Sequence, residues 1–98
     1  MTTEMRFLSF LKDFLRENGE IYTVRKYKMD EREVEIIGVG TCRRIPMGIV
    51  EHRAQLEPYV SKSGFSKLED WVDRILYYIP NKDDTKYLYH VVRLNGTR

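Results

Sequence analysis

Hydrophobic residues recur at helical spacing near the start of the chain and again in its last third. Residues Phe7, Leu8, Leu11, Phe14 and Leu15 predict an amphipathic helix over residues 4–17, and the Asn-Gly pair at 18–19 is typical of a helix end. A second apolar stripe predicts a long helix over residues 68–79: Leu68, Trp71, Val72, Ile75, Leu76 and Ile79. Ser66 and Glu69 match a capping box before it.

Between these helices the chain is rich in β-branched and aromatic residues, which predicts strands over residues 21–27, 33–37, 41–45 and 87–94. Gly38 and Gly40 indicate a bulge or a sharp bend in the sheet. Pro46 is expected to break the third strand, which can resume over residues 48–50. A short helix is expected around residues 56–60, with Pro58 in its first turn.

This order of elements excludes a helical bundle and favours a mixed barrel or an α+β sheet. The chain has 98 residues, of which 42% are hydrophobic, so we expect one domain spanning residues 1–98. The expected architecture is a small mixed β-barrel flanked by the N-terminal helix, with a helical insertion before the last strand.

Charged residues make up a third of the chain but nearly cancel, leaving a net charge of +2. This balance permits nucleic-acid binding through a local patch without requiring it. Cys42 is the only cysteine and the chain has two histidines, so neither a disulfide nor a metal site is expected, and no motif indicates a cofactor. No apolar run is long enough to span a bilayer, and a cytoplasmic protein is expected. The single glutamine among many Lys, Arg and Glu is typical of thermophilic proteins.

Three segments together resemble the ASCH branch of the PUA-like superfamily. The sequence TVR at 23–25 is similar to the T-x-R strand that follows the first helix of ASCH domains. The sequence GVGTCRR at 38–44 is placed like the central barrel strands. The sequence SGFS at 63–66, followed by a Trp-bearing helix and YLYHV at 87–91, resembles archaeal ASCH-like proteins. The resemblance covers residues 7–94.

The resemblance implies a PUA-like barrel that binds RNA in a cleft between barrel and helices. Some bacterial ASCH proteins instead hydrolyse acetylcytidine with a lysine, a threonine and a glutamate. Thr23 matches that threonine, whereas Glu20 occupies the position of the lysine and supplies no amine. Glu51 and Glu57 lie only in the broad region of the glutamate, so no catalytic residue is assigned.

Seven residues are candidates for contacts with nucleic acid: Arg25, Lys26, Tyr27, Arg43, Arg44, Tyr59 and Lys62. The cations could bind phosphates, with Arg25 as a bidentate donor, and the tyrosines could stack on bases. Each has an alternative interpretation. Arg25 could pair with Glu20 or Glu35, the other cations could belong to a solvated surface, and the aromatic rings could lie in the core.

The leading hypothesis is a nucleic-acid-binding module, for RNA rather than DNA, that holds a nucleotide in a basic cleft. The second hypothesis is a small hydrolase acting on a modified nucleoside, with Thr23 and a carboxylate. The third is a protein-interaction or regulatory module that recruits a partner through an exposed strand edge. A monomer or a weak homodimer is expected.

Overall fold

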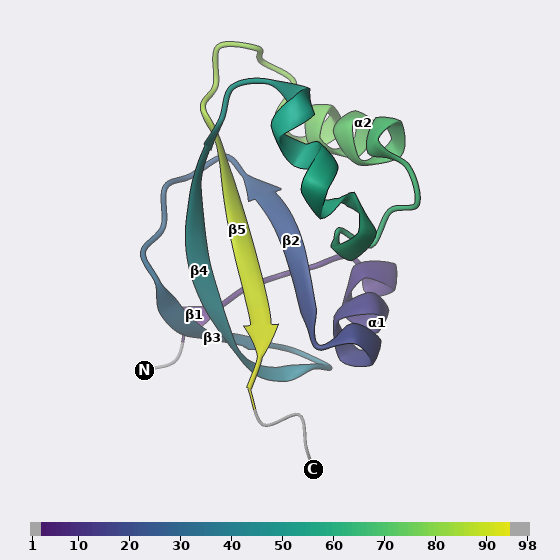
Figure 1. Ribbon diagram of the computed structural model, residues 1–98. Coiled ribbons are helices and arrows are strands. Elements are labelled where there is room, and N and C mark those ends of the chain that lie inside the picture. Colours follow the sequence, from purple (N-terminus) through teal and green to yellow (C-terminus); the bar gives the residue numbers. More distant parts are fainter. Residues whose placement is uncertain (1–2, 95–98) are drawn as a thin grey trace.

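The computed structural model describes residues 3–94, which form five strands, two α-helices and one 3₁₀ helix (Figure 1). In chain order these are β1 (Thr3–Glu4), α1 (Ser9–Asn18), β2 (Glu20–Arg25), β3 (Arg32–Ile36), β4 (Gly40–Val50), η1 (Arg53–Lys62), α2 (Leu68–Tyr78) and β5 (Lys86–Arg93). The α+β class, the first helix, the helical insertion and the last strand agree with the sequence prediction.

The five strands form one sheet in the order β1-β3-β4-β5-β2. β1 runs parallel to β3, and the other neighbours are antiparallel. β1 and β2 are therefore the two edges, and no ladder joins them within residues 3–94. The sheet is not closed into the barrel that the sequence predicted.

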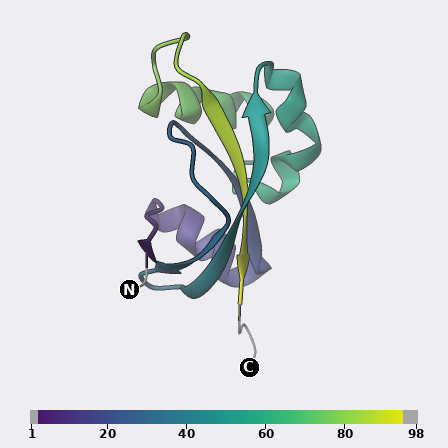
Figure 2. The same ribbon diagram turned by 90° about the vertical axis from the view of Figure 1, so that its left-hand side faces the viewer.

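Alternation along the strands sends apolar side chains to both faces of this sheet, and each face has its own core. One core lies under α1 and contains Met5, Leu15, Ile21, Val34, Ile36, Cys42 and Val91. The other lies under η1 and α2 and contains Val24, Leu56, Trp71, Ile75, Ile79 and Leu88. In Figures 1 and 2, α1 lies beside the lower half of the sheet, whereas η1 and α2 lie beside its upper half.

The first helix begins at Ser9, five residues later than predicted, because the chain before it joins the sheet. Thr3 and Glu4 pair with β3, and the Met5 N–H donates to the Glu35 carbonyl at 3.0 Å. The Met5 side chain is buried in the core. These long-range contacts outweigh the helical spacing of the local sequence.

Pro46 does not break β4, contrary to the prediction. The Leu94 N–H donates to the Thr41 carbonyl, so alternation along the ladder turns the Pro46 nitrogen away from β5. β3 pairs with β4 only as far as Arg44. On the side of β4 that faces β3, no strand therefore needs a backbone N–H from position 46, which proline lacks. A register shift after Pro46 then restores the pairing at Gly48.

The capping box predicted at Ser66 is also wrong. α2 begins at Leu68 with Lys67 as its N-cap, and no side chain caps its free N–H groups. Glu69 and Asp70 instead place negative charge in the first turn, where it interacts favourably with the helix dipole. None of the helices within residues 3–94 has the length and hydropathy needed to cross a membrane.

Two buried residues fix the connection between β2 and β3. Tyr89 is 1% exposed, and its hydroxyl donates to the Tyr27 carbonyl and accepts from the Met29 N–H. Arg44 is 4% exposed and donates to the backbone carbonyl and the carboxylate of Asp30. The segment after β2 is thereby held against the sheet.

Candidate functional site

A cleft of about 500 Å³ lies beside β2, the edge strand, and we call it the β2 cleft. Its walls come from the segment leading into α1, from β2 and residues 26–29, from the loop before α2, and from one face of α2. Because these segments are far apart in the sequence, only the folded chain creates the cleft. Its volume lies in the range of typical ligand sites.

The charge of the β2 cleft differs from that of the whole chain. The chain has 17 basic and 15 acidic residues. The cleft is lined by no acidic residue and by four basic ones: Arg6, Arg25, Lys26 and Arg74. This concentration of cations beside a mostly apolar surface favours an anionic ligand with an apolar or aromatic part.

Arg25 is one of these four cations and forms no ion pair with a carboxylate within residues 3–94. Its Nε donates to Thr23 Oγ1 at 3.2 Å, its Nη2 donates to the Arg6 carbonyl at 2.8 Å, and its guanidinium lies 4.7 Å from the centre of the Phe7 ring. Burial, with a smaller contribution from the charge of Arg44, lowers the pKa of Arg25 to about 10. A bound phosphate would compensate this desolvated cation.

The alternative pairing of Arg25 with a glutamate is not observed. Glu20 binds Lys62 and His90, and Glu35 accepts from the Thr41 hydroxyl. The guanidinium of Arg25 is therefore held by neutral groups, which leaves its charge available to a ligand.

Aromatic side chains provide the second feature of the β2 cleft. Six of them line it: Phe7, Tyr22, Tyr27, Phe65, Trp71 and Tyr78. Trp71 is buried in the core as the sequence predicted, whereas Tyr27 and Tyr78 are 70% and 55% exposed. Exposed rings beside cations are suited to stacking with the bases of a single-stranded nucleic acid.

The structure brings three of the seven predicted binding residues, Arg25, Lys26 and Tyr27, together at this cleft. Lys26 Nζ lies 5.7 Å from the centre of the Tyr27 ring and 3.5 Å from an Asp84 carboxylate oxygen. The remaining four residues do not line the cleft.

Arg43 and Arg44 are instead committed to ion pairs on the far part of the sheet. Arg43 lies 3.6 Å from Glu31 and 3.3 Å from Glu33. Arg44 is buried beside Asp30, at 3.2 Å. The basic track expected from the sequence is therefore interrupted by acidic partners.

Lys62 and Tyr59 belong to a cluster around the start of β2 that adjoins the β2 cleft at Tyr22. Lys62 and His90 bind the two carboxylate oxygens of Glu20 at 2.6 and 2.7 Å. The Tyr22 ring stacks on His90 at 4.2 Å and lies 4.6 Å from the Tyr59 ring. Lys62, and to a lesser extent His90, lowers the pKa of Glu20.

The arrangement around Thr23 does not favour the hydrolase hypothesis. Thr23 is 9% exposed and its hydroxyl accepts a hydrogen bond from Arg25. Glu20 is three residues away on the same strand, so its side chain projects from the opposite face of the sheet. No carboxylate is therefore placed to activate the threonine from that position.

Sequence reasoning missed Arg6, Phe7, Arg74 and Tyr78 as lining residues. Arg6 and Phe7 lie in an irregular segment that the helical spacing assigned to α1. Arg74 and Tyr78 lie one turn apart on α2, next to its apolar stripe. Their spacing would have placed them on one helical face, but nothing local shows which surface that face lines.

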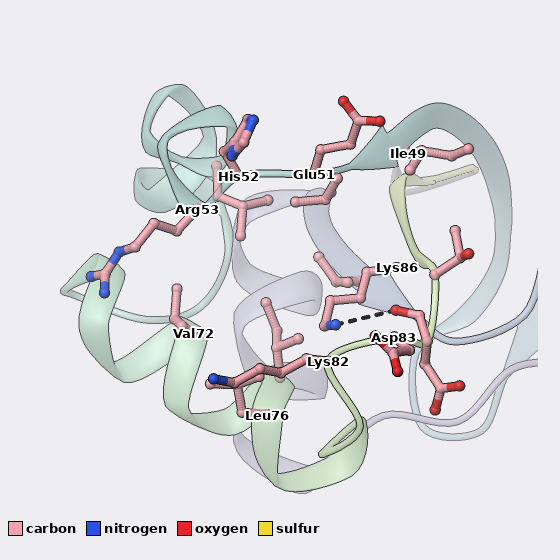
Figure 3. A pocket seen from close by; sticks show the side chains of 15 residues that line it. Ile49, Glu51, His52, Arg53, Val72, Leu76, Lys82, Asp83 and Lys86 are labelled. Carbon is pink, nitrogen blue, oxygen red and sulfur yellow. Dashed lines mark hydrogen bonds between the residues drawn. The ribbon is translucent and has the colours of Figure 1, made fainter.

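A second cavity, of about 570 Å³, lies beside Val72, Ile75 and Leu76 of α2, against the end of β4 and residues 82–86 (Figure 3). Its rim carries Arg53, Lys82 and Lys86, but also Glu51, Asp83 and Asp84. Figure 3 shows the Lys86 ammonium turned inward, where it donates to the Asp84 carbonyl at 3.2 Å. Because acidic and basic residues are balanced, this cavity shows no preference for an anion.

Residues 3–94 contain no cluster of three His, Cys, Asp or Glu side chains that could hold a metal ion. Comparisons of the chain with family models, with curated proteins and with solved structures found no match. We therefore infer the function from the β2 cleft.

Proposed function

We propose that this protein is a nucleic-acid-binding module that holds a nucleotide of single-stranded RNA in the β2 cleft. The observation that carries this proposal is the composition of the cleft, which combines four cations and six aromatic side chains with no carboxylate. Arg25 is the principal phosphate contact, and Tyr27 stacks on a base.

Membership of the ASCH branch is part of this proposal and rests on the sequence motifs alone. The cytoplasmic location and the monomeric or weakly dimeric state remain predictions. RNA is proposed over DNA on the same family resemblance.

The experiment is fluorescence anisotropy with labelled single-stranded RNA, single-stranded DNA and duplex oligonucleotides across a salt series. We expect single-stranded RNA to bind at micromolar concentration or tighter, and its affinity to fall as salt rises. Absence of binding to every oligonucleotide at low salt would refute the proposal.

Arg25→Ala tests the principal contact, with Arg43→Ala as the matched control because Arg43 lies outside the cleft. Loss of one phosphate contact should weaken binding and lower the salt slope by about 0.7 for a single strand. Arg43→Ala should leave both quantities unchanged. If Arg25→Ala unfolds, Arg74→Ala tests the same cleft at an exposed position of α2.

A protein partner is the second candidate, and the open edge of β2 favours it. The Arg93 N–H donates to the Gly19 carbonyl, so alternation along the ladder turns the backbone groups of Tyr22 and Val24 away from β5. An added strand could use these groups. Binding of a protein without any affinity for oligonucleotides would support this candidate over the first.

A further inference from the structure

Three exposed side chains continue the β2 cleft outward between α1 and α2: Phe10, Arg74 and Tyr78. We call them the aromatic ledge. Arg74 and Tyr78 line the mouth of the cleft and lie one turn apart on α2, so they project from the same side of the helix. Phe10 comes from α1 and is 42% exposed.

The ledge is continuous with the cleft through direct contacts. The Arg74 guanidinium lies 5.9 Å from the centre of the Phe10 ring. The Phe10 ring meets Phe65, which lines the cleft, edge to face at 5.5 Å. The ledge is therefore a preformed surface rather than a set of scattered side chains.

The charge of Arg74 is available to a ligand. Arg74 takes part in none of the ion pairs found within residues 3–94, although Asp70 and Asp73 are close in sequence. A cation that contacts one exposed ring and lies one helical turn from another matches the repeating chemistry of a single strand, in which a phosphate separates two bases.

We propose, on the basis of the function proposed above, that the ligand is a single strand of at least two consecutive nucleotides. One base occupies the β2 cleft, the adjacent base stacks on Tyr78, and Arg74 contacts the phosphate between them. A duplex is a poor ligand because the faces of its bases are already stacked on one another.

The test is a length series of single-stranded RNA, from a mononucleotide to a pentanucleotide, in competition with a labelled oligonucleotide. Affinity should rise sharply from the mononucleotide to the dinucleotide. Tyr78→Leu should remove that step, a loss of roughly 5- to 160-fold for one base–aromatic stack. A 2-aminopurine in the second position should lose its stacking-dependent quenching in the same variant.

Tyr77→Leu is the matched control. Tyr77 is 74% exposed, does not line the cleft and meets the Tyr78 ring edge to face at 5.1 Å, so this variant removes a neighbouring ring but keeps Tyr78. The variant should retain the step between mononucleotide and dinucleotide. Leucine is a good helix former, so neither substitution should disturb α2.

Three outcomes would overturn the ledge. These are equal affinity for mononucleotide and dinucleotide, a Tyr78→Leu variant that keeps the affinity step between them, or self-association of the protein that Tyr78→Leu abolishes. If mononucleotide and dinucleotide bind equally well but Arg25→Ala weakens mononucleotide binding, the proposed function stands and only the ledge is refuted. Absence of binding at every length would refute the function itself.

Discussion

Gly64 lies in the loop before α2 and has a backbone conformation that favours glycine. Its φ is +88°, in the left-handed region, where a residue with a side chain pays about 1–2 kcal/mol. A Cβ added there would lie 2.4 Å from Leu11 Cδ2, which is far inside contact distance. Gly64→Ala therefore combines backbone strain with steric overlap.

The overlap involves the terminal methyl of a leucine, so Leu11 can rotate away rather than force the backbone apart. An off-rotamer side chain costs about 0.5–1.5 kcal/mol. Together with the strained φ, we expect Gly64→Ala to lower the free energy of unfolding by about 2–3 kcal/mol. For a domain of this size that corresponds to a fall in Tm of roughly 10–20 °C.

Gly19→Ala isolates the backbone contribution. Gly19 has a φ of +80°, and a Cβ added there would meet no atom within 4 Å. This variant should cost only about 1–2 kcal/mol. Urea unfolding of both variants, with equal m-values, gives the cost of the overlap by difference.

The double variant Leu11→Ala/Gly64→Ala completes the test. In the Leu11→Ala background, Gly64→Ala should lower the free energy of unfolding only as much as Gly19→Ala does in the wild type. Leu11→Ala and Gly64→Ala should therefore be non-additive. Equal costs for Gly64→Ala and Gly19→Ala in the wild-type background would refute the overlap. Since Ser63 and Phe65 line the β2 cleft, the same comparison tests how rigidly that wall is held.

Two further predictions concern hydrogen bonds that connect distant parts of the chain. Tyr89→Phe removes the hydroxyl that bridges the Tyr27 carbonyl and the Met29 N–H, and it should lower the free energy of unfolding in urea by about 1–3 kcal/mol. The control Tyr77→Phe, on the exposed face of α2, should leave that free energy unchanged. Glu20→Gln tests the pH dependence of stability. Lys62 holds the pKa of Glu20 below its ordinary value of 4.5, so the ionised carboxylate stabilises the folded chain above that pH. This stabilisation is lost as the pH falls through the lowered pKa. Wild-type stability should therefore fall more steeply than that of Glu20→Gln between about pH 5 and pH 3, and parallel curves would contradict the assignment.

Local pattern predicted the elements of this fold because their apolar spacing is strong. The stripe from Leu68 to Ile79 predicted α2, and the alternation around Ile21 and Val91 predicted the edge strand β2 and its neighbour β5. The errors arose where distant segments decide the outcome. Met5 joins β3 instead of α1, and Pro46 is tolerated because its neighbouring strand has already ended.

The candidate site was predictable only in part, for a similar reason. Arg25 and Tyr27 come from one continuous segment, so strand geometry could place them near each other. Arg74 and Phe10 come from two different helices, and local sequence does not show that these helices meet at one cleft. Arg44 appeared to be a surface cation, because its burial beside Asp30 depends on how the segment after β2 returns.

Cys42 provides a chemical reporter of the state of the sheet. It is the only cysteine of the chain, it is fully buried in β4, and burial raises the pKa of its thiol to about 11. Thiol reagents react with the thiolate, which is the nucleophile, so they should modify this protein only when the sheet opens. The rate of modification would then measure the opening of the sheet under native conditions. A cysteine introduced at the exposed Tyr27 position could also carry a label at the cleft, because the buried Cys42 would not compete for the reagent.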